Sequence, residues 1–175
     1  MPSFIIHIAI AQEYKKNYSQ DINHLEHFLE GTIAPDFGKN REERDKLHYT
    51  KNHDDFVSYP DFFAEHQITN DYERGYLLHL IADEAFYCYL FEEEIAKMRK
   101  NSDNLYYDYD CINKELLKSY DIPNWNQVKS YIHEIDGTPK YLNLPKVIDF
   151  IHTIANISLQ EQILSLQKTG KILLK

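Results

Sequence analysis

The stretch that decides the fold is Gly75-Tyr76-Leu77-Leu78-His79-Leu80-Ile81-Ala82-Asp83, which lies within a long run of helix-forming residues. His79 and Asp83 are four residues apart, so a helix places both side chains on one face, about one turn from each other. Burying a carboxylate and an imidazole is unfavourable unless a partner compensates them, and a divalent metal ion is one such partner. The rest of this face is apolar or aromatic and continues through Tyr76, Leu80, Phe86, Tyr87 and Leu90.

Apolar residues recur with the period of a helix along almost the whole chain. A first helix carries His7 on the same face as Phe4, Ile5, Ile8 and Ala11. Ser19 or Asp21 can cap a second helix, which ends before Pro35 because proline disfavours helix at the preceding residue. The inward residues of this second helix are predicted to be Ile22, Leu25, Phe28, Leu29 and Ile33.

Charged residues dominate positions 39–53, which we predict to be irregular before a short helix over 54–66. Asn70 and Glu73 have the spacing of a capping box and open a helix that runs to about residue 100. Further helices are predicted near 105–120, from Asn124 to about 135, and from Asn143 through the C-terminal segment to 172. We therefore predict an all-α fold, a single-domain multi-helix bundle over residues 1–175.

Composition and charge narrow the possible functions. The formal net charge is −9, and without a basic stripe a stable complex with duplex nucleic acid is not expected. Cys88 and Cys111 have no zinc-ribbon spacing, so we expect ordinary thiols in a reducing compartment. The N-terminal apolar stretch lacks a basic region and is too short to span a bilayer, which predicts a cytoplasmic protein without stable membrane insertion.

Five polar residues fall on apolar faces or at breaks between helices, and they are His7, Asp36, His48, His79 and Asp83. Imidazole and carboxylate are the ligand set of zinc, manganese and iron sites in hydrolases. Each residue also has a simpler explanation: His7 as a hydrogen-bonded core histidine, Asp36 as a turn former and His48 as a solvated loop residue. Asp83 fits such an explanation least well, because the inward positions of its own helix offer no lysine or arginine.

Three elements occur in order, Gly31-Thr32-Ile33-Ala34-Pro35-Asp36, then Leu47-His48-Tyr49, then the stretch from Gly75 to Asp83. Together with His7 they resemble the zinc-dependent phospholipase C family, and more closely its short bacterial cytoplasmic relatives. The resemblance covers about residues 1–120, and helices within 124–172 would complete the bundle. It implies a phospholipase C or nuclease-like bundle of helices around a cluster of zinc ions, in proteins that cleave phosphodiesters.

The resemblance also implies roles for individual residues. Asp36, His48, His79 and Asp83 would hold one metal ion, and His7 with a shared Asp83 would contribute to a second. The family's second element, His-x-x-x-Glu, has no counterpart downstream of Asp83, for which Asp108 or Asp110 could be only a partial substitute. One or two ions, zinc by resemblance, are therefore expected. Asp36 is the residue expected to orient or deprotonate the attacking water in hydrolysis of a small-molecule phosphoester.

Two alternatives remain open. The spacing from His7 to Pro35-Asp36-Phe37-Gly38-Lys39 is similar to that of the HD-type metal phosphohydrolases, although Pro35 replaces their metal-binding histidine and His53-Asp54 lacks the following Gly-Lys. A non-catalytic helical protein with a vestigial or structural metal site is the other alternative. The apolar final helix, about 143–172, could pack in the core or pair with a second copy in a homo-oligomer.

Overall fold

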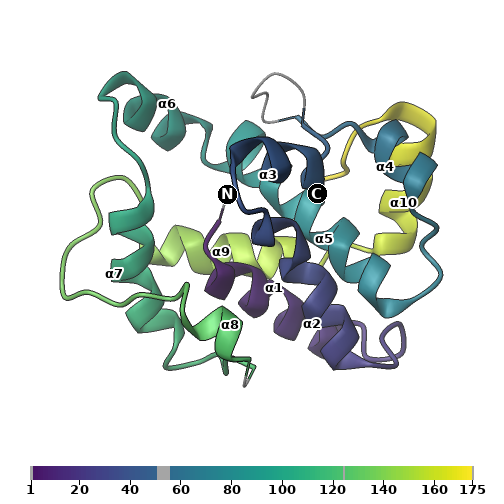
Figure 1. Cartoon of the computed structure of the whole chain (residues 1–175), viewed down its shortest axis with the longest axis horizontal. Coiled ribbons are helices and arrows are strands. Elements are labelled where there is room, and N and C mark those ends of the chain that lie inside the picture. Colours follow the sequence, from purple (N-terminus) through teal and green to yellow (C-terminus); the bar gives the residue numbers. More distant parts are fainter. Residues whose placement is uncertain (1, 51–55, 124, 175) are drawn as a thin grey trace.

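Helices make up the regular structure of the computed structural model, which describes residues 2–50, 56–123 and 125–174 (Figure 1). Within these residues there is no named strand, only an isolated antiparallel bridge between Thr50 and Val57. The all-α prediction is confirmed for this part of the chain. The helices are α1 (Phe4–Asn17), α2 (Leu25–Ile33), α3 (Arg41–Leu47), α4 (Tyr59–Glu65), α5 (Asp71–Ala85), α6 (Glu92–Lys100), α7 (Tyr106–Leu116), α8 (Asn126–Lys129), α9 (Leu144–Ala155) and α10 (Leu159–Thr169), with a 3₁₀ turn at Ala34–Phe37 and a π-helical turn at Phe86–Leu90.

Helix α1 lies at the centre of the fold, between α2 on one side and α9 on the other (Figure 1). Every residue from Ile5 to Ala11 is buried, so this part of the helix is covered on all sides. A helix that is apolar all round is expected in a protein interior and not at its surface. No helix in the described ranges is long and apolar enough to cross a membrane.

Helices α2 and α5 pack backbone against backbone because each carries a glycine at the crossing. A Cβ atom at Gly31 would lie 1.9 Å from the carbonyl oxygen of Tyr72, and one at Gly75 would lie 2.1 Å from that of Phe28. Neither position has room for a side chain, so both glycines are required for this close approach. The crossing positions the site, because Asp36 directly follows α2 and His79 lies one turn beyond Gly75.

The structure corrects the predicted start of the second helix. Helix α2 begins at Leu25 with His24 as its N-cap, so neither Ser19 nor Asp21 caps it. The preceding turn is held by Lys15, whose Nζ donates to the backbone carbonyls of Ser19 and Ile22. Leu25, which we predicted to face inward, is 38% exposed because it lies at the first position of the helix.

The charged segment predicted to be irregular contains helix α3. Asn40 caps this helix by accepting a hydrogen bond from the backbone N–H of Glu43 at 2.9 Å. The helix buries none of its own residues. Periodicity in apolar residues therefore could not reveal it, whereas its cap could.

The long central helix is interrupted before residue 100. Asn70 caps α5 as predicted, by accepting from the N–H of Glu73 at 3.0 Å. After Ala85 the chain widens into the π-helical turn, in which the N–H of Phe91 donates to the carbonyl of Phe86 at 3.0 Å. A continuous α-helix would place Phe91 about 140° around the axis from Phe86. The wider turn instead stacks the two rings, with centroids 4.4 Å apart.

The C-terminal segment forms two helices instead of one. Asn143 caps α9 as predicted, but the helix ends at Ala155. Ser158 begins α10 by accepting from the N–H of Glu161 at 3.3 Å. Asn124, the predicted cap of the preceding helix, lies outside the described residues. The helix that follows it, α8, spans only Asn126–Lys129 and does not reach residue 135.

Candidate metal centre

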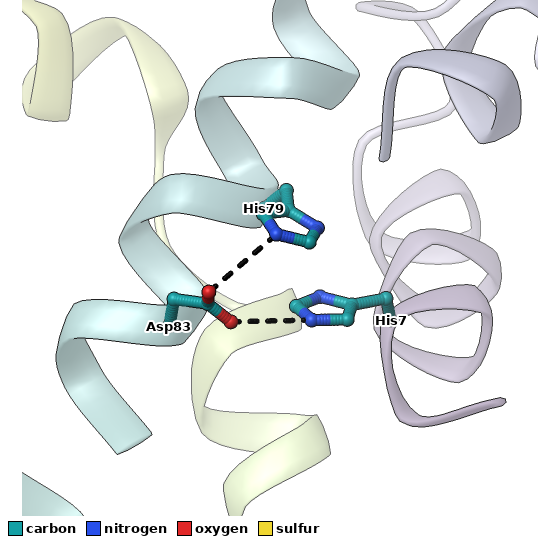
Figure 2. A group of neighbouring side chains, drawn as sticks. All are labelled: His7, His79 and Asp83. Carbon is teal, nitrogen blue, oxygen red and sulfur yellow. Dashed lines mark ion pairs between the residues drawn. The ribbon is translucent and has the colours of Figure 1, made fainter. Parts of the chain in front are cut away.

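His79 and Asp83 lie on one face of α5, and His7 approaches them from α1 (Figure 2). Asp83 Oδ2 is 3.5 Å from His79 Nε2, and Asp83 Oδ1 is 3.2 Å from His7 Nε2. Asp83 is only 6% exposed. Within the described part of the chain its ion pairs are all with histidines. The buried carboxylate thus has no lysine or arginine partner there, as expected from the sequence.

Asp36 and His48 complete the cluster from two other segments. Asp36 lies in the 3₁₀ turn after α2, and His48 caps the C-terminus of α3. The Nε2 atom of His48 lies 3.4 Å from Asp36 Oδ1, 3.2 Å from Asp83 Oδ2 and 3.0 Å from His79 Nε2. The structure therefore brings together all five residues that the sequence singled out, His7 included.

Two backbone carbonyls set the proton positions on the imidazoles. The carbonyl oxygen of Thr32 lies 2.8 Å from His79 Nδ1, and that of Arg44 lies 2.7 Å from His48 Nδ1. A carbonyl can only accept, so each Nδ1 carries a proton and donates it. In the neutral rings both Nε2 atoms then present lone pairs. Two nitrogen lone pairs face each other at 3.0 Å, with two carboxylates beside them.

A proton on His48 compensates this arrangement only in part. Burial lowers the pKa of His48, but the neighbouring Asp36 and Asp83 carboxylates outweigh it and raise the pKa to about 10. The imidazolium has one N–H at Nε2, whereas three acceptor atoms lie within 3.4 Å of that nitrogen. One positive charge also leaves one of the two buried carboxylates unbalanced.

The donor set fits a divalent metal ion. Zinc–ligand bonds of about 2.0–2.2 Å place neighbouring ligand atoms of a tetrahedral site about 3.3–3.6 Å apart. The nitrogen–oxygen distances here run from 3.2 to 4.0 Å. Asp36 Oδ1 makes no hydrogen bond in the described part of the chain, so an orphaned buried ligand atom is present. Two groups of buried side chains could hold an ion, Asp36 with His48 and His79, and His7 with His79 and Asp83.

His7 occupies the far side of the shared carboxylate. Its ring stacks on that of His79, with centroids 3.9 Å apart and an angle of 16° between the planes. Burial is the main cause that lowers the pKa of His7, and the neighbouring His79 lowers it further, so the ring is neutral at pH 7. Neither ring nitrogen makes a hydrogen bond within the described residues. A neutral, unbonded imidazole beside Asp83 Oδ1 is what a second ion would require.

The position of His48 is also fixed by Tyr76 of α5 and by Tyr49, to which the sequence alone assigned no role in positioning it. The hydroxyl of Tyr76 donates to the carbonyl of Leu47 at 2.6 Å. Tyr49, on the other side of His48, adopts a left-handed backbone with φ of 54° and donates its hydroxyl to Glu65 at 2.8 Å. Such a backbone is unfavourable for tyrosine, so these bonds hold the chain reversal that presents His48. The inward position of Tyr76, one turn before His79, is the only signal the sequence offered.

Asp108 does not substitute for the missing second ligand set. Its carboxylate is buried on α7 and accepts hydrogen bonds from the backbone N–H groups of Lys140, Tyr141 and Leu142 at 2.6–2.7 Å. These bonds use both oxygens to hold a loop. Asp110 belongs to neither candidate ligand group. The His53-Asp54 pair of the alternative prediction lies outside the described residues.

Compared with known proteins, the chain matches no family model, no curated protein and no solved structure. The resemblance to the zinc-dependent phospholipase C family therefore stays a prediction from motifs. The class that fold and site define is an all-helical protein with a buried cluster of histidines and aspartates that could hold a metal ion.

Proposed function

We propose that this protein is a metal-dependent hydrolase of phosphoesters. The observation that carries the proposal is the convergence of four acceptor atoms, from Asp36, His48, His79 and Asp83, in a buried site. Three separate segments supply them, and each histidine is oriented by a backbone carbonyl. Orienting hydrogen bonds of this kind are typical of histidines that bind metals.

The proposed cofactor is zinc, as one or two ions. When bound, a divalent ion lowers the pKa of water towards about 7 and stabilises negative charge developing on a phosphoryl group. Asp36, His48, His79 and Asp83 would hold the first ion. His7 and the other oxygen of Asp83 would hold the second.

Asp36 is the proposed catalytic carboxylate. It lies at the end of the buried cluster, on a 3₁₀ turn instead of a long helix, and its Oδ1 has no hydrogen bond in the described part of the chain. With Oδ1 bound to the ion, the other carboxylate oxygen of Asp36 could accept a proton from the attacking water, or orient that water toward phosphorus. In cleavage the water oxygen would form a bond to phosphorus, the bond from phosphorus to the leaving oxygen would break, and the leaving oxygen would take up a proton.

The proposed substrate is a small phosphoester. The motifs of the chain resemble those of phosphodiester-cleaving enzymes, whereas its own charge of −9 gives no basic surface for a long polyanion. Pro35 weakens the case for the alternative HD-type phosphohydrolase, because the residue before Asp36 then offers no imidazole to bind a metal ion.

A specific observation favours a second candidate, a structural metal site without catalysis. His7 and His79 have no exposed surface, and the remaining three ligands are at least nine-tenths buried. A substrate needs access to at least one open position on the metal.

The test combines metal analysis with an activity panel. Protein purified without chelators or a polyhistidine tag is analysed for zinc and manganese, then assayed on phosphomonoesters and phosphodiesters with each metal. We expect near-equimolar metal or more, and turnover that falls about 100-fold or more in Asp36→Asn. His79→Ala should lose both the bound metal and the turnover, and His27→Ala, at an exposed histidine of α2, is its matched control. Bound metal without turnover on any ester would favour the structural site, and metal-free protein would contradict both.

A further inference from the structure

Tyr109 lies on α7, which packs on α1 and contacts the π-helical turn that follows α5. One turn beyond it, Asn113 accepts a hydrogen bond from Ser3 Oγ at 2.9 Å, and Ser3 is the N-cap of α1. The ring of Tyr109 packs on Phe86, with centroids 6.4 Å apart, and Phe86 follows Asp83 by about one turn. Helix α7 is therefore fixed to the start of α1 and to the turn that directly follows α5.

The hydroxyl of Tyr109 is buried without a partner. The side chain is 5% exposed, and no described residue hydrogen-bonds to its oxygen. A buried tyrosine hydroxyl usually has a partner, because an unpaired one loses its bonds to water without replacement. The pKa of Tyr109 is raised well above its usual value. Burial is the main cause, and the negative charges of Asp83 and Asp36 raise it further. The phenol thus keeps its proton and lies within the field of both site carboxylates.

A neutral donor near two carboxylates and without an acceptor of its own is suited to an anionic ligand. Asp36 Oδ1 and both oxygens of Asp83 face histidines, so a ligand bound at the centre is the acceptor that suits the phenol best. Hydrogen bonds from fixed donors to an anionic oxygen are strong in a site that excludes water.

We propose that the Tyr109 hydroxyl donates a hydrogen bond to an oxygen of the phosphoryl group bound at the His7–Asp36–His48–His79–Asp83 centre. This inference rests on the proposed function, since it takes the centre to hold a metal and a phosphoester. Tyr109 would thereby select a tetrahedral oxyanion and hold it in one orientation.

The test measures binding of inorganic phosphate to the metal-loaded protein by calorimetry, in wild type and in Tyr109→Phe. Loss of one hydrogen bond to an anion should weaken phosphate binding about 10- to 100-fold, with metal affinity unchanged. Tyr14→Phe is the matched control, because Tyr14 is wholly buried on α1 two turns beyond His7 and packs on Tyr18 and Phe28. This control should bind phosphate as wild type does.

A second readout separates a ligand-binding role from a structural one. Because the hydroxyl has no partner in the protein, Tyr109→Phe should leave the Tm of the metal-free protein unchanged or raise it. A lower Tm would mean that the hydroxyl has a structural bond and would overturn the inference. Equal phosphate affinities in wild type and variant would also overturn it, as would weaker metal binding in the variant. If wild type takes up no metal in the preceding titration, the proposed function itself fails, and this inference fails with it.

Discussion

Replacing Asp83 by asparagine tests the residue that joins the two halves of the site. The variant keeps the size of the side chain but removes its charge. It alters the contacts of Oδ1 with His7 at 3.2 Å and of Oδ2 with His48 at 3.2 Å and His79 at 3.5 Å. The histidines outweigh burial and hold the pKa of Asp83 well below its usual value, so the group is ionised at pH 7.

Removing one partner of a buried charge pair typically costs about 3–5 kcal/mol. If the metal ion is the missing partner of Asp83, zinc affinity should fall by a similar free energy, which corresponds to more than about 100-fold in Kd. Competition with a chromophoric chelator at pH 7 measures that affinity. Asp149→Asn, at an exposed position of α9, is the matched control and should bind zinc as wild type does. A Kd for Asp83→Asn within about threefold of wild type would refute the reasoning.

Four further predictions follow from the contacts described above. Metal binding at pH 7 should release about one proton. The neighbouring carboxylates raise the pKa of His48 to about 10 in the metal-free protein, and the imidazole must lose its Nε2 proton to bind the metal ion. Calorimetry in buffers of different ionisation enthalpy measures the number of protons released. The same raised pKa stabilises the metal-free fold below pH 6.5, and this contribution should decline in denaturant titrations as the pH rises towards 10. Gly75→Ala should lower stability by at least about 1–3 kcal/mol and weaken zinc binding together, because its Cβ would lie 2.1 Å from the Phe28 carbonyl oxygen and force α2 from α5. Asp108→Asn should lower the free energy of unfolding by about 2–4 kcal/mol without changing zinc affinity, since it removes the negative charge and replaces one of the two oxygens that accept from three loop amides by an NH2 donor. An unchanged denaturation midpoint would count against that loop contact.

Much of the site could be predicted because local spacing determines it. His79 and Asp83 are four residues apart, so they share a face of any helix that contains both. Nearly all residues of α5 are buried, so this face is buried as well. Asn70 and Asn143 cap their helices through contacts three residues away, which are visible in the sequence. The convergence of Asp36 and His48 on this face could not be derived from spacing. It depends on the glycine crossing of α2 with α5 and on the hydroxyl of Tyr76, which are long-range contacts.

The errors in the fold prediction have two physical causes. Some helices carry little local signal: α3 buries no side chain of its own, so only the cap at Asn40 marks it. In other places tertiary packing ends a helix that the local sequence could continue. Phe91 leaves the helix to stack on Phe86, and Ser158 starts a new helix two residues after the chain turns at Asn156. Tyr109 was missed because a tyrosine on an apolar face is usually part of the core, and only the structure shows that no described residue hydrogen-bonds to its hydroxyl.

Anomalous scattering from a crystal grown with zinc tests the central claim most directly. Data collected on both sides of the zinc absorption edge should show a peak enclosed by Asp36, His48, His79 and Asp83, and a second peak beside His7 if two ions bind. The account is contradicted if those four side chains surround no peak while zinc scatters elsewhere, or if the refined structure shows the His48 imidazolium alone bridging the two carboxylates.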